Sequence, residues 1–236
     1  ISLGLVGSEM CIRDRSRGIE VTLNTRNIVT KDFFWETSLT YTKYKDRWKE
    51  RTPDWKPNVY EKETDPIRAI YSRRADHIMQ IGEEAPTAQP DLRPGQIVIK
   101  DLDGYVRDEN GNPKVDENGR FMLLGRPDGI IDEADTELIG TLDPGWMASM
   151  TNTFKYKGFD LNIMFNGMFD RIMQDPTEMD FGVNGGGIAQ SGYNMLRTIK
   201  DRWTFDNPST TRPSSYYITG TNYTAGDFFY QKAWFI

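Results

Sequence analysis

Apolar and polar residues alternate with a period of two in several segments of the chain. In Gly18–Thr25 one side carries Ile19, Val21 and Leu23, and the other carries Glu20, Thr22 and Asn24. This alternation predicts a half-buried β-strand. A polar link, Arg26–Asp32, leads to a second alternating segment, Phe33–Lys45. That second segment is long for a soluble sheet and suits a strand that crosses a membrane at a tilt.

The same pattern returns near residue 147. Met147–Lys155 alternates, and a tight turn around Lys157 and Gly158 leads into the alternating strand Phe159–Phe169. Aromatic residues flank this turn on both sides, as expected for an interfacial girdle at the rim of a membrane barrel. Asp227–Ile236 predicts the start of a further strand.

Two long polar segments, 46–145 and 170–225, separate these strands and show little periodicity. Connections of this length are unusual inside a soluble sheet, whereas outer-membrane barrels carry long extracellular loops and short periplasmic turns. We therefore predict an all-β fold: antiparallel strands of a partial transmembrane β-barrel with long extracellular loops. A plugged transporter barrel has about 22 strands, so residues 16–236 account for only part of one.

The first residues have a different origin in this interpretation. Leu5–Asp14 reads LVGSEMCIRD, which is the translation of CTC GTG GGC TCG GAG ATG TGT ATA AGA GAC, a transposase-type sequencing adapter. We expect residues 1–15 to be translated adapter and exclude them from reasoning about the fold. With no initiator Met and a stop inside the apolar run Phe235–Ile236, the sequence is expected to be truncated at both ends.

Composition removes several classes of function. The single cysteine, Cys11, lies in the adapter-like segment, and His77 is the single histidine. Disulfides, cysteine-ligated metals and most histidine chemistry are therefore excluded. The net charge of −6 leaves no basic face for nucleic acid. No apolar run approaches the roughly 18 residues of a membrane helix, and no carboxylate pair indicates an enzyme.

An acidic stretch has the spacing of a calcium loop if Tyr105–Pro127 loops out. Position six of that loop is then Gly129, where a sharp turn needs glycine. Between Asp101 and Asp135 there are ten acidic and four basic residues, a balance that favours a cation. The predicted Ca²⁺ ligands, at positions one, three, five, seven, nine and twelve, are Asp101, Asp103, Asp128, the Ile130 carbonyl, Asp132 and Asp135.

Two features leave a second interpretation open for this stretch. The insert splits the loop, and position twelve is aspartate rather than the longer bidentate glutamate. The alternative is a solvated acidic loop held by turns and by hydrogen bonds from aspartate side chains to the backbone.

Most of the chain after residue 15 resembles the SusC/RagA-like TonB-dependent receptors. The chain departs from the family pattern where Tyr105–Pro127 interrupts the run of aspartates that normally continues into the Asp-Gly pair. The stretches that carry the resemblance are Gly18–Thr42, Gly95–Gly104, Asp128–Trp146, Asn152–Phe169, Arg202–Ser215 and Asp227–Ile236.

This resemblance implies a Gram-negative outer-membrane importer with a plug inside its barrel, in contact with outer-membrane lipid. Its energy would come from a TonB–ExbB–ExbD complex, a SusD-like surface lipoprotein would close its mouth, and its cargo would be oligosaccharides or peptides. These residues alone would not transport. The alternative function is a secreted calcium- and carbohydrate-binding β-domain, for which the acidic loop and the aromatic residues argue.

Overall fold

The computed structural model describes residues 13–117, 119–183, 192–215 and 226–235. Its largest element is a five-stranded antiparallel sheet in the order β1-β2-β7-β8-β9. The strands are β1 (Arg13–Val29), β2 (Phe33–Glu50), β7 (Trp146–Tyr156), β8 (Phe159–Gln174) and β9 (Tyr230–Phe235).

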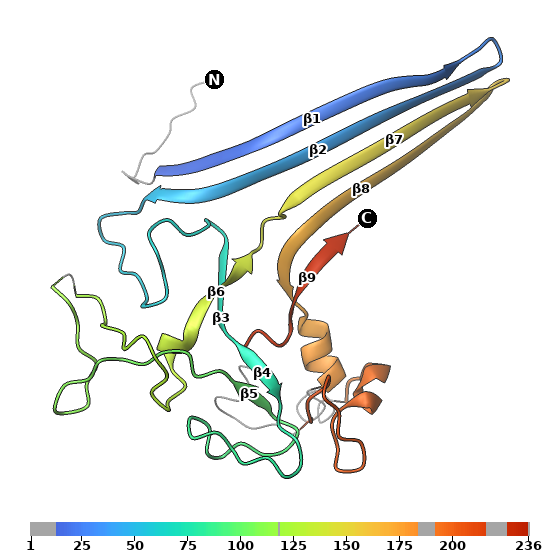
Figure 1. Ribbon diagram of the computed structural model, residues 1–236. Helices are drawn as coiled ribbons and strands as arrows, with labels where there is room; N and C mark the ends of the chain where they lie inside the picture. Colours follow the sequence, from blue (N-terminus) through green and yellow to red (C-terminus); the bar gives the residue numbers. More distant parts are fainter. Residues whose placement is uncertain (1–12, 118, 184–191, 216–225, 236) are drawn as a thin grey trace.

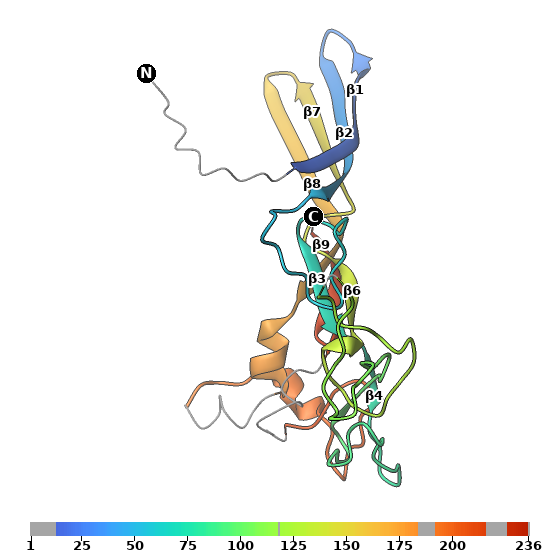
Figure 2. The ribbon, with the colours of Figure 1, turned by 90° about the vertical axis from the view of Figure 1, so that its left-hand side faces the viewer.

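The connections between these strands are strongly asymmetric (Figure 1). At one end, residues 30–32 join β1 to β2, and a two-residue turn at Lys157 and Gly158 joins β7 to β8. Both turn residues have positive φ, 43° and 88°, as in the hairpin turn that matches the twist of its strands. At the other end the connections are long, residues 51–145 and 175–229, and their described parts lie beyond the sheet in both views (Figure 2).

The pairing register separates the sheet into two faces. Phe33 lies opposite Tyr156, and the ladder continues without a shift to Thr42 opposite Met147. Alternation then places one set of side chains on each side. The apolar face comprises Val21, Leu23, Trp35, Leu39, Tyr41, Met150, Phe154, Leu161, Ile163 and Phe165. The polar face comprises Thr22, Asn24, Ser38, Thr40, Ser149, Thr151, Asn162 and Asn166.

The apolar face is uncovered. Leu23 is 52% exposed, Leu161 55% and Phe165 47%. A contiguous apolar surface of this size marks contact with a partner or with a membrane. Eleven residues of β7 correspond to about 33 Å along the strand, or roughly 25 Å in height at a barrel tilt near 40°. That height equals the apolar band of an outer-membrane barrel, about 25 Å.

Aromatic side chains mark both ends of this band. Near the short links, Phe33 contacts Tyr156 and Trp35 stacks on Phe154, with ring centroids 6.4 and 5.7 Å apart. At the other end, Trp146 stacks on Phe169 at 3.8 Å and contacts Tyr41 at 6.0 Å. The aromatic residues beside the β7–β8 turn therefore contact those of β2, and a second aromatic cluster lies at the loop side.

The strands are longer than their alternation predicts. β1 continues to Val29, β2 to Glu50 and β8 to Gln174, so the long segments begin at residues 51 and 175 rather than 46 and 170. Backbone pairing continues past the alternating segments because ladder hydrogen bonds join main-chain groups and do not require apolar side chains. Residues 13–15 pair with β2, while residues 1–12 lie outside the described residues, so the adapter interpretation stays a prediction.

The two long segments fold together into a small hydrophobic core. β3 (Ala69–Arg73) pairs with β6 (Thr136–Thr141), and β4 (Ala75–Ile78) pairs with β5 (Ile97–Ile99). Trp203, from the second segment, is buried against β4 and β5. Gly95 makes this packing possible, because a Cβ there would lie 2.5 Å from the Trp203 ring.

The described parts of the loops contain the short helical turns η1 (Glu133–Asp135), η2 (Glu178–Val183) and η3 (Arg197–Asp201). In the part of the chain that the structure describes, no helix is long and apolar enough to cross a membrane.

A positive charge should lower the stability of the protein much more on the apolar face than on the polar face. Leu39→Arg, near the middle of the apolar face, should destabilise the full-length protein in lipid vesicles by about 2–4 kcal/mol. Ser38→Arg, one residue away on the polar face, should lower the free energy of unfolding far less. Urea unfolding in vesicles, followed by tryptophan fluorescence, measures both; equal losses would contradict the assignment of the faces.

Candidate functional site

The acidic loop predicted from the sequence is assembled, with its insert looped out. The described residues of the insert form three short segments, each of which bridges the other two: Tyr105 bridges Leu123, Arg107 bridges Pro113 and Val115 bridges Phe121. The amide of Leu124 donates to the Gly104 carbonyl at 2.8 Å, which brings the two halves of the loop together. Gly129 has φ +85°, the sharp turn expected at position six.

Asp135 is the centre of this loop and is fully buried, with 0% exposure. One carboxylate oxygen accepts from the amides of Leu102 at 2.7 Å and Asp103 at 3.3 Å, and the other accepts from the amide of Asp132 at 2.8 Å. Burial raises the pKa of the Asp135 carboxyl, and these amide bonds oppose the rise. The side chain therefore fastens the two halves of the loop to each other.

The other aspartates make similar bonds. Asp101 accepts from the amides of Asp128 at 3.2 Å and Gly129 at 2.7 Å. Asp103 accepts from Gly104 at 2.8 Å and Gly125 at 2.7 Å. These are the hydrogen bonds from aspartate side chains to the backbone expected for an acidic loop held by turns.

The remaining predicted ligands also have partners. Asp128 accepts from the amide of Ile130 at 3.0 Å, and Asp132 pairs with Arg107 at 3.3 Å. Among the residues that the structure describes, no three His, Cys, Asp or Glu side chains are arranged so that they could hold one metal ion. The loop geometry thus fits the turn-held interpretation directly, and the Ca²⁺ site stays a prediction.

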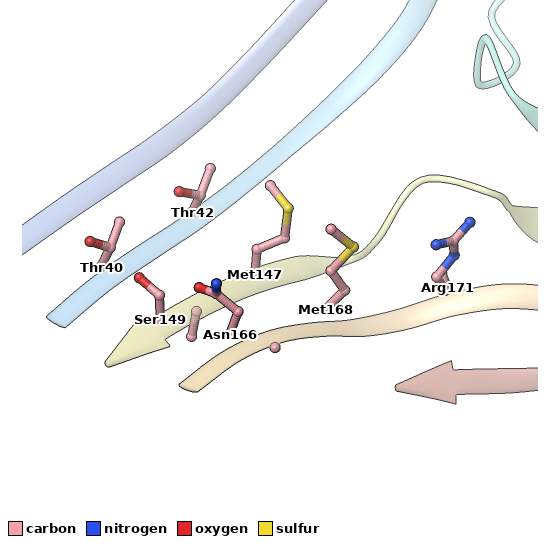
Figure 3. A pocket seen from close by; sticks show the side chains of 9 residues that line it. Thr40, Thr42, Met147, Ser149, Asn166, Met168 and Arg171 are labelled. Atoms are coloured by element: carbon pink, nitrogen blue, oxygen red, sulfur yellow. The ribbon is translucent and has the colours of Figure 1, made fainter. Parts of the chain in front are cut away.

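The polar face carries a hollow of about 690 Å³ that spans three strands (Figure 3). Its side chains come from alternate positions of β2, β7 and β8 and stand on the same side of the sheet. They combine hydroxyl and amide groups with two methionines and one guanidinium. The labelled lining residues are Thr40, Thr42, Met147, Ser149, Asn166, Met168 and Arg171.

A β-bulge brings Arg171 into this hollow. Met168 pairs with Phe235 and Arg171 with Ala233, so the ladder shifts between them. Asp170 occupies the bulge with φ +64°, and its carboxylate pairs with Lys232 at 3.2 Å. Without the extra residue, Met168 and Arg171 would lie on opposite faces. The Nε of Arg171 is buried and has no hydrogen-bond partner among the described residues.

A second hollow, of about 440 Å³, lies where the loops meet the sheet. Tyr60, Arg73, Glu133, Gln174 and Tyr230 are among its lining residues. Burial raises the pKa of Tyr60, and burial together with a hydrogen bond to Asp65 raises that of Tyr71, whose ring is 5.1 Å from Tyr60. Aromatic faces beside a guanidinium, a carboxylate and an amide can hold a polar organic ligand.

Polar side chains on the apolar face bond to one another. The Trp35 indole and the Thr37 hydroxyl both donate to the Asn152 amide oxygen, at 3.0 and 2.7 Å, and the Asn27 amide donates to Thr37 at 2.7 Å. Lipid offers no hydrogen-bonding partner, so this mutual satisfaction is what a membrane-facing surface requires.

Sequence reasoning identified the acidic loop but neither hollow. Alternation assigns Thr40, Ser149 and Asn166 to one face, yet their proximity depends on the register between strands far apart in the chain. The position of Arg171 depends on a β-bulge that the sequence pattern does not predict.

Comparison with known proteins supports the predicted resemblance. No family model matches the chain. It is 24% identical, over 215 residues, to TonB-dependent receptor P3 of Formosa agariphila, a match covering 84% of this chain and 18% of that protein. It superposes on the structure of the RagAB peptide transporter with a TM-score of 0.60 and 16% identity, covering 94% of this chain and 22% of that one.

The chain thus spans about a fifth of the length of the proteins it matches. The resemblance to SusC/RagA-like TonB-dependent receptors and the all-β barrel fold are confirmed by these two matches.

Removal of the Asp135 carboxylate should loosen the loop. Asp135→Ala leaves the amides of Leu102 and Asp132 without their acceptor, at a cost of about 2–4 kcal/mol. Hydrogen exchange in the full-length protein should then accelerate at both amides. Asp108→Ala, in an exposed turn of the insert, is the control, since water replaces its bonds. Unchanged hydrogen exchange in Asp135→Ala would show that this carboxylate does not hold the two halves of the loop together.

Calcium binding is tested by calorimetry on the full-length protein. If Ca²⁺ binds, titration should release heat that disappears in Asp101→Ala and persists in Asp108→Asn, outside the predicted ligand set. Binding should weaken at acid pH, because a cation favours the ionised form of Asp135, whose pKa burial has raised. No heat at millimolar Ca²⁺ would leave the turn-held loop as the correct interpretation.

Proposed function

We propose that this chain is part of the barrel wall of a TonB-dependent importer in the outer membrane of a Gram-negative bacterium. The observation that carries the proposal is the two-faced sheet, with long segments at one end and tight turns at the other. The apolar face would contact lipid and the polar face would line the lumen. The long segments would then face the cell exterior.

The hollows fit a passage for polar cargo. The hollow of Thr40, Asn166 and Arg171 lies on the lumenal face, and that of Tyr60, Arg73 and Glu133 lies at the mouth. Hydroxyl, amide and charged groups beside aromatic rings suit oligosaccharides or peptides. The RagAB transporter, which this chain resembles in fold, is a peptide transporter.

The partners belong to the proposal as well. By the resemblance, a SusD-like lipoprotein would cover the mouth, and the TonB–ExbB–ExbD complex would supply energy through a plug. The proposed role is transport rather than catalysis. The exposed apolar face argues against the secreted calcium- and carbohydrate-binding domain, since a secreted domain would leave Leu23, Leu161 and Phe165 in water.

The test uses the full-length gene in its host. Deleting the gene should abolish growth on at least one oligosaccharide or peptide source, and deleting TonB should cause the same loss. Asn166→Trp, which fills the lumenal hollow, should lower uptake while outer-membrane insertion is kept, whereas Ser38→Thr, on the same face outside the hollow, should not. A protein that is secreted and folds without detergent would contradict the proposal and favour the secreted domain.

A further inference from the structure

A group of basic side chains continues the apolar face beyond its loop-side aromatic cluster, and we define Arg17, Lys43, Lys45 and Arg47 as the outer basic cluster. On β2, alternation places Lys43, Lys45 and Arg47 on the same face as Leu39 and Tyr41. On β1, alternation places Arg17 on the same face as Val21, and no register shift lies between them. Arg13 and Arg15 are left out because they fall in the segment interpreted as adapter.

No acidic side chain among the described residues forms an ion pair with this cluster. Arg17 lies directly opposite Lys45, and like charges in directly opposed positions destabilise a sheet. None of the ion pairs between described residues includes a member of the cluster. The nearest acidic side chains on these strands, Glu20 and Asp46, belong by alternation to the polar face. Arg17, Lys43 and Lys45 are exposed.

The cluster lies at a defined depth relative to the apolar band. Tyr41 contacts Trp146 at the loop-side end of the band. Lys43 and Lys45 follow two and four residues later, about 7 and 13 Å along the strand, or roughly 5 and 9 Å higher at a 45° tilt. Long basic side chains at such a boundary keep their stems on apolar surface and extend their charges outward.

Resting on the proposed function, which makes this end extracellular, we propose that the outer basic cluster binds the phosphate groups of lipid A, the phosphorylated glycolipid of the outer leaflet. A guanidinium group can donate two parallel hydrogen bonds to the oxygens of one phosphate. Clustered Lys and Arg side chains attract anionic lipid headgroups. The apolar face directly below accepts acyl chains. A molecule that carries both phosphate and acyl chains satisfies both surfaces at once, which free phosphate does not.

The experiment measures lipid binding to the purified full-length receptor by native mass spectrometry. The probes are diphosphoryl lipid A, the same lipid after chemical dephosphorylation, and inorganic phosphate. The test variant is Lys43→Gln/Lys45→Gln/Arg47→Gln. The matched control, Lys31→Gln/Lys155→Gln/Lys157→Gln, removes the same charge near the short-link end of the sheet.

The test variant should bind diphosphoryl lipid A roughly 100-fold more weakly than wild type, and the control should stay within about threefold. Added salt should weaken the wild-type interaction. Equal affinities of wild type and test variant, or equal affinities for both lipids, would overturn the proposal. Inorganic phosphate that binds as tightly as lipid A would reveal a free-anion site instead.

Insertion and TonB-dependent uptake of the same variants separate this proposal from the proposed function. Wild-type receptor that does not enter the outer membrane contradicts the proposed function. Equal lipid A affinities in a correctly inserted receptor contradict only the lipid proposal.

Discussion

The antiparallel ladder between β2 and β7 joins two strands that 95 intervening residues separate in the chain, positions 51–145. Its register sets which side chains share a face. A slip of one residue would move Trp35, Leu39 and Tyr41 from the apolar to the polar face. The same ladder satisfies the backbone polar groups on the facing edges of both strands, and the β1–β2 and β7–β8 ladders satisfy those on their other edges. Together with the β7–β8 ladder, this pairing sets the two faces, the aromatic clusters and the hollow on the polar face.

Closure of so long a connection costs entropy, but the cost grows only slowly with length. The long segments offset part of it with their own core, in which Ile78, Ile97, Ile99 and Trp203 are buried. Because Trp203 comes from the second segment, the two excursions support each other. The hollow lined by Tyr60, Arg73 and Tyr230 exists only because residues from both segments meet beside the end of β8.

Satisfaction of buried polar groups also organises the local sites. Asp135 accepts three backbone amides inside the acidic loop, and Asn152 accepts from Trp35 and Thr37 on the apolar face. In both places neighbouring groups complete the hydrogen bonds of a polar side chain, which is fully buried at Asp135 and half-buried at Asn152. The outer basic cluster is the exception, since its charges form no ion pairs among the described residues. This imbalance is the reason for proposing an anionic ligand outside the chain.

The sequence by itself determined the existence of the long strands, the two faces of each and the asymmetry of the connections, but not the full lengths of the strands, because alternation and turn residues are local properties. It also determined that Asp101 to Asp135 can form one loop with an insert. Only the tertiary structure decided the pairing of β2 with β7, the packing of Trp203 on Gly95 and the bulge that turns Arg171 onto the polar face. These features depend on contacts between residues far apart in the chain, and a local pattern carries no information about which distant partner will be met.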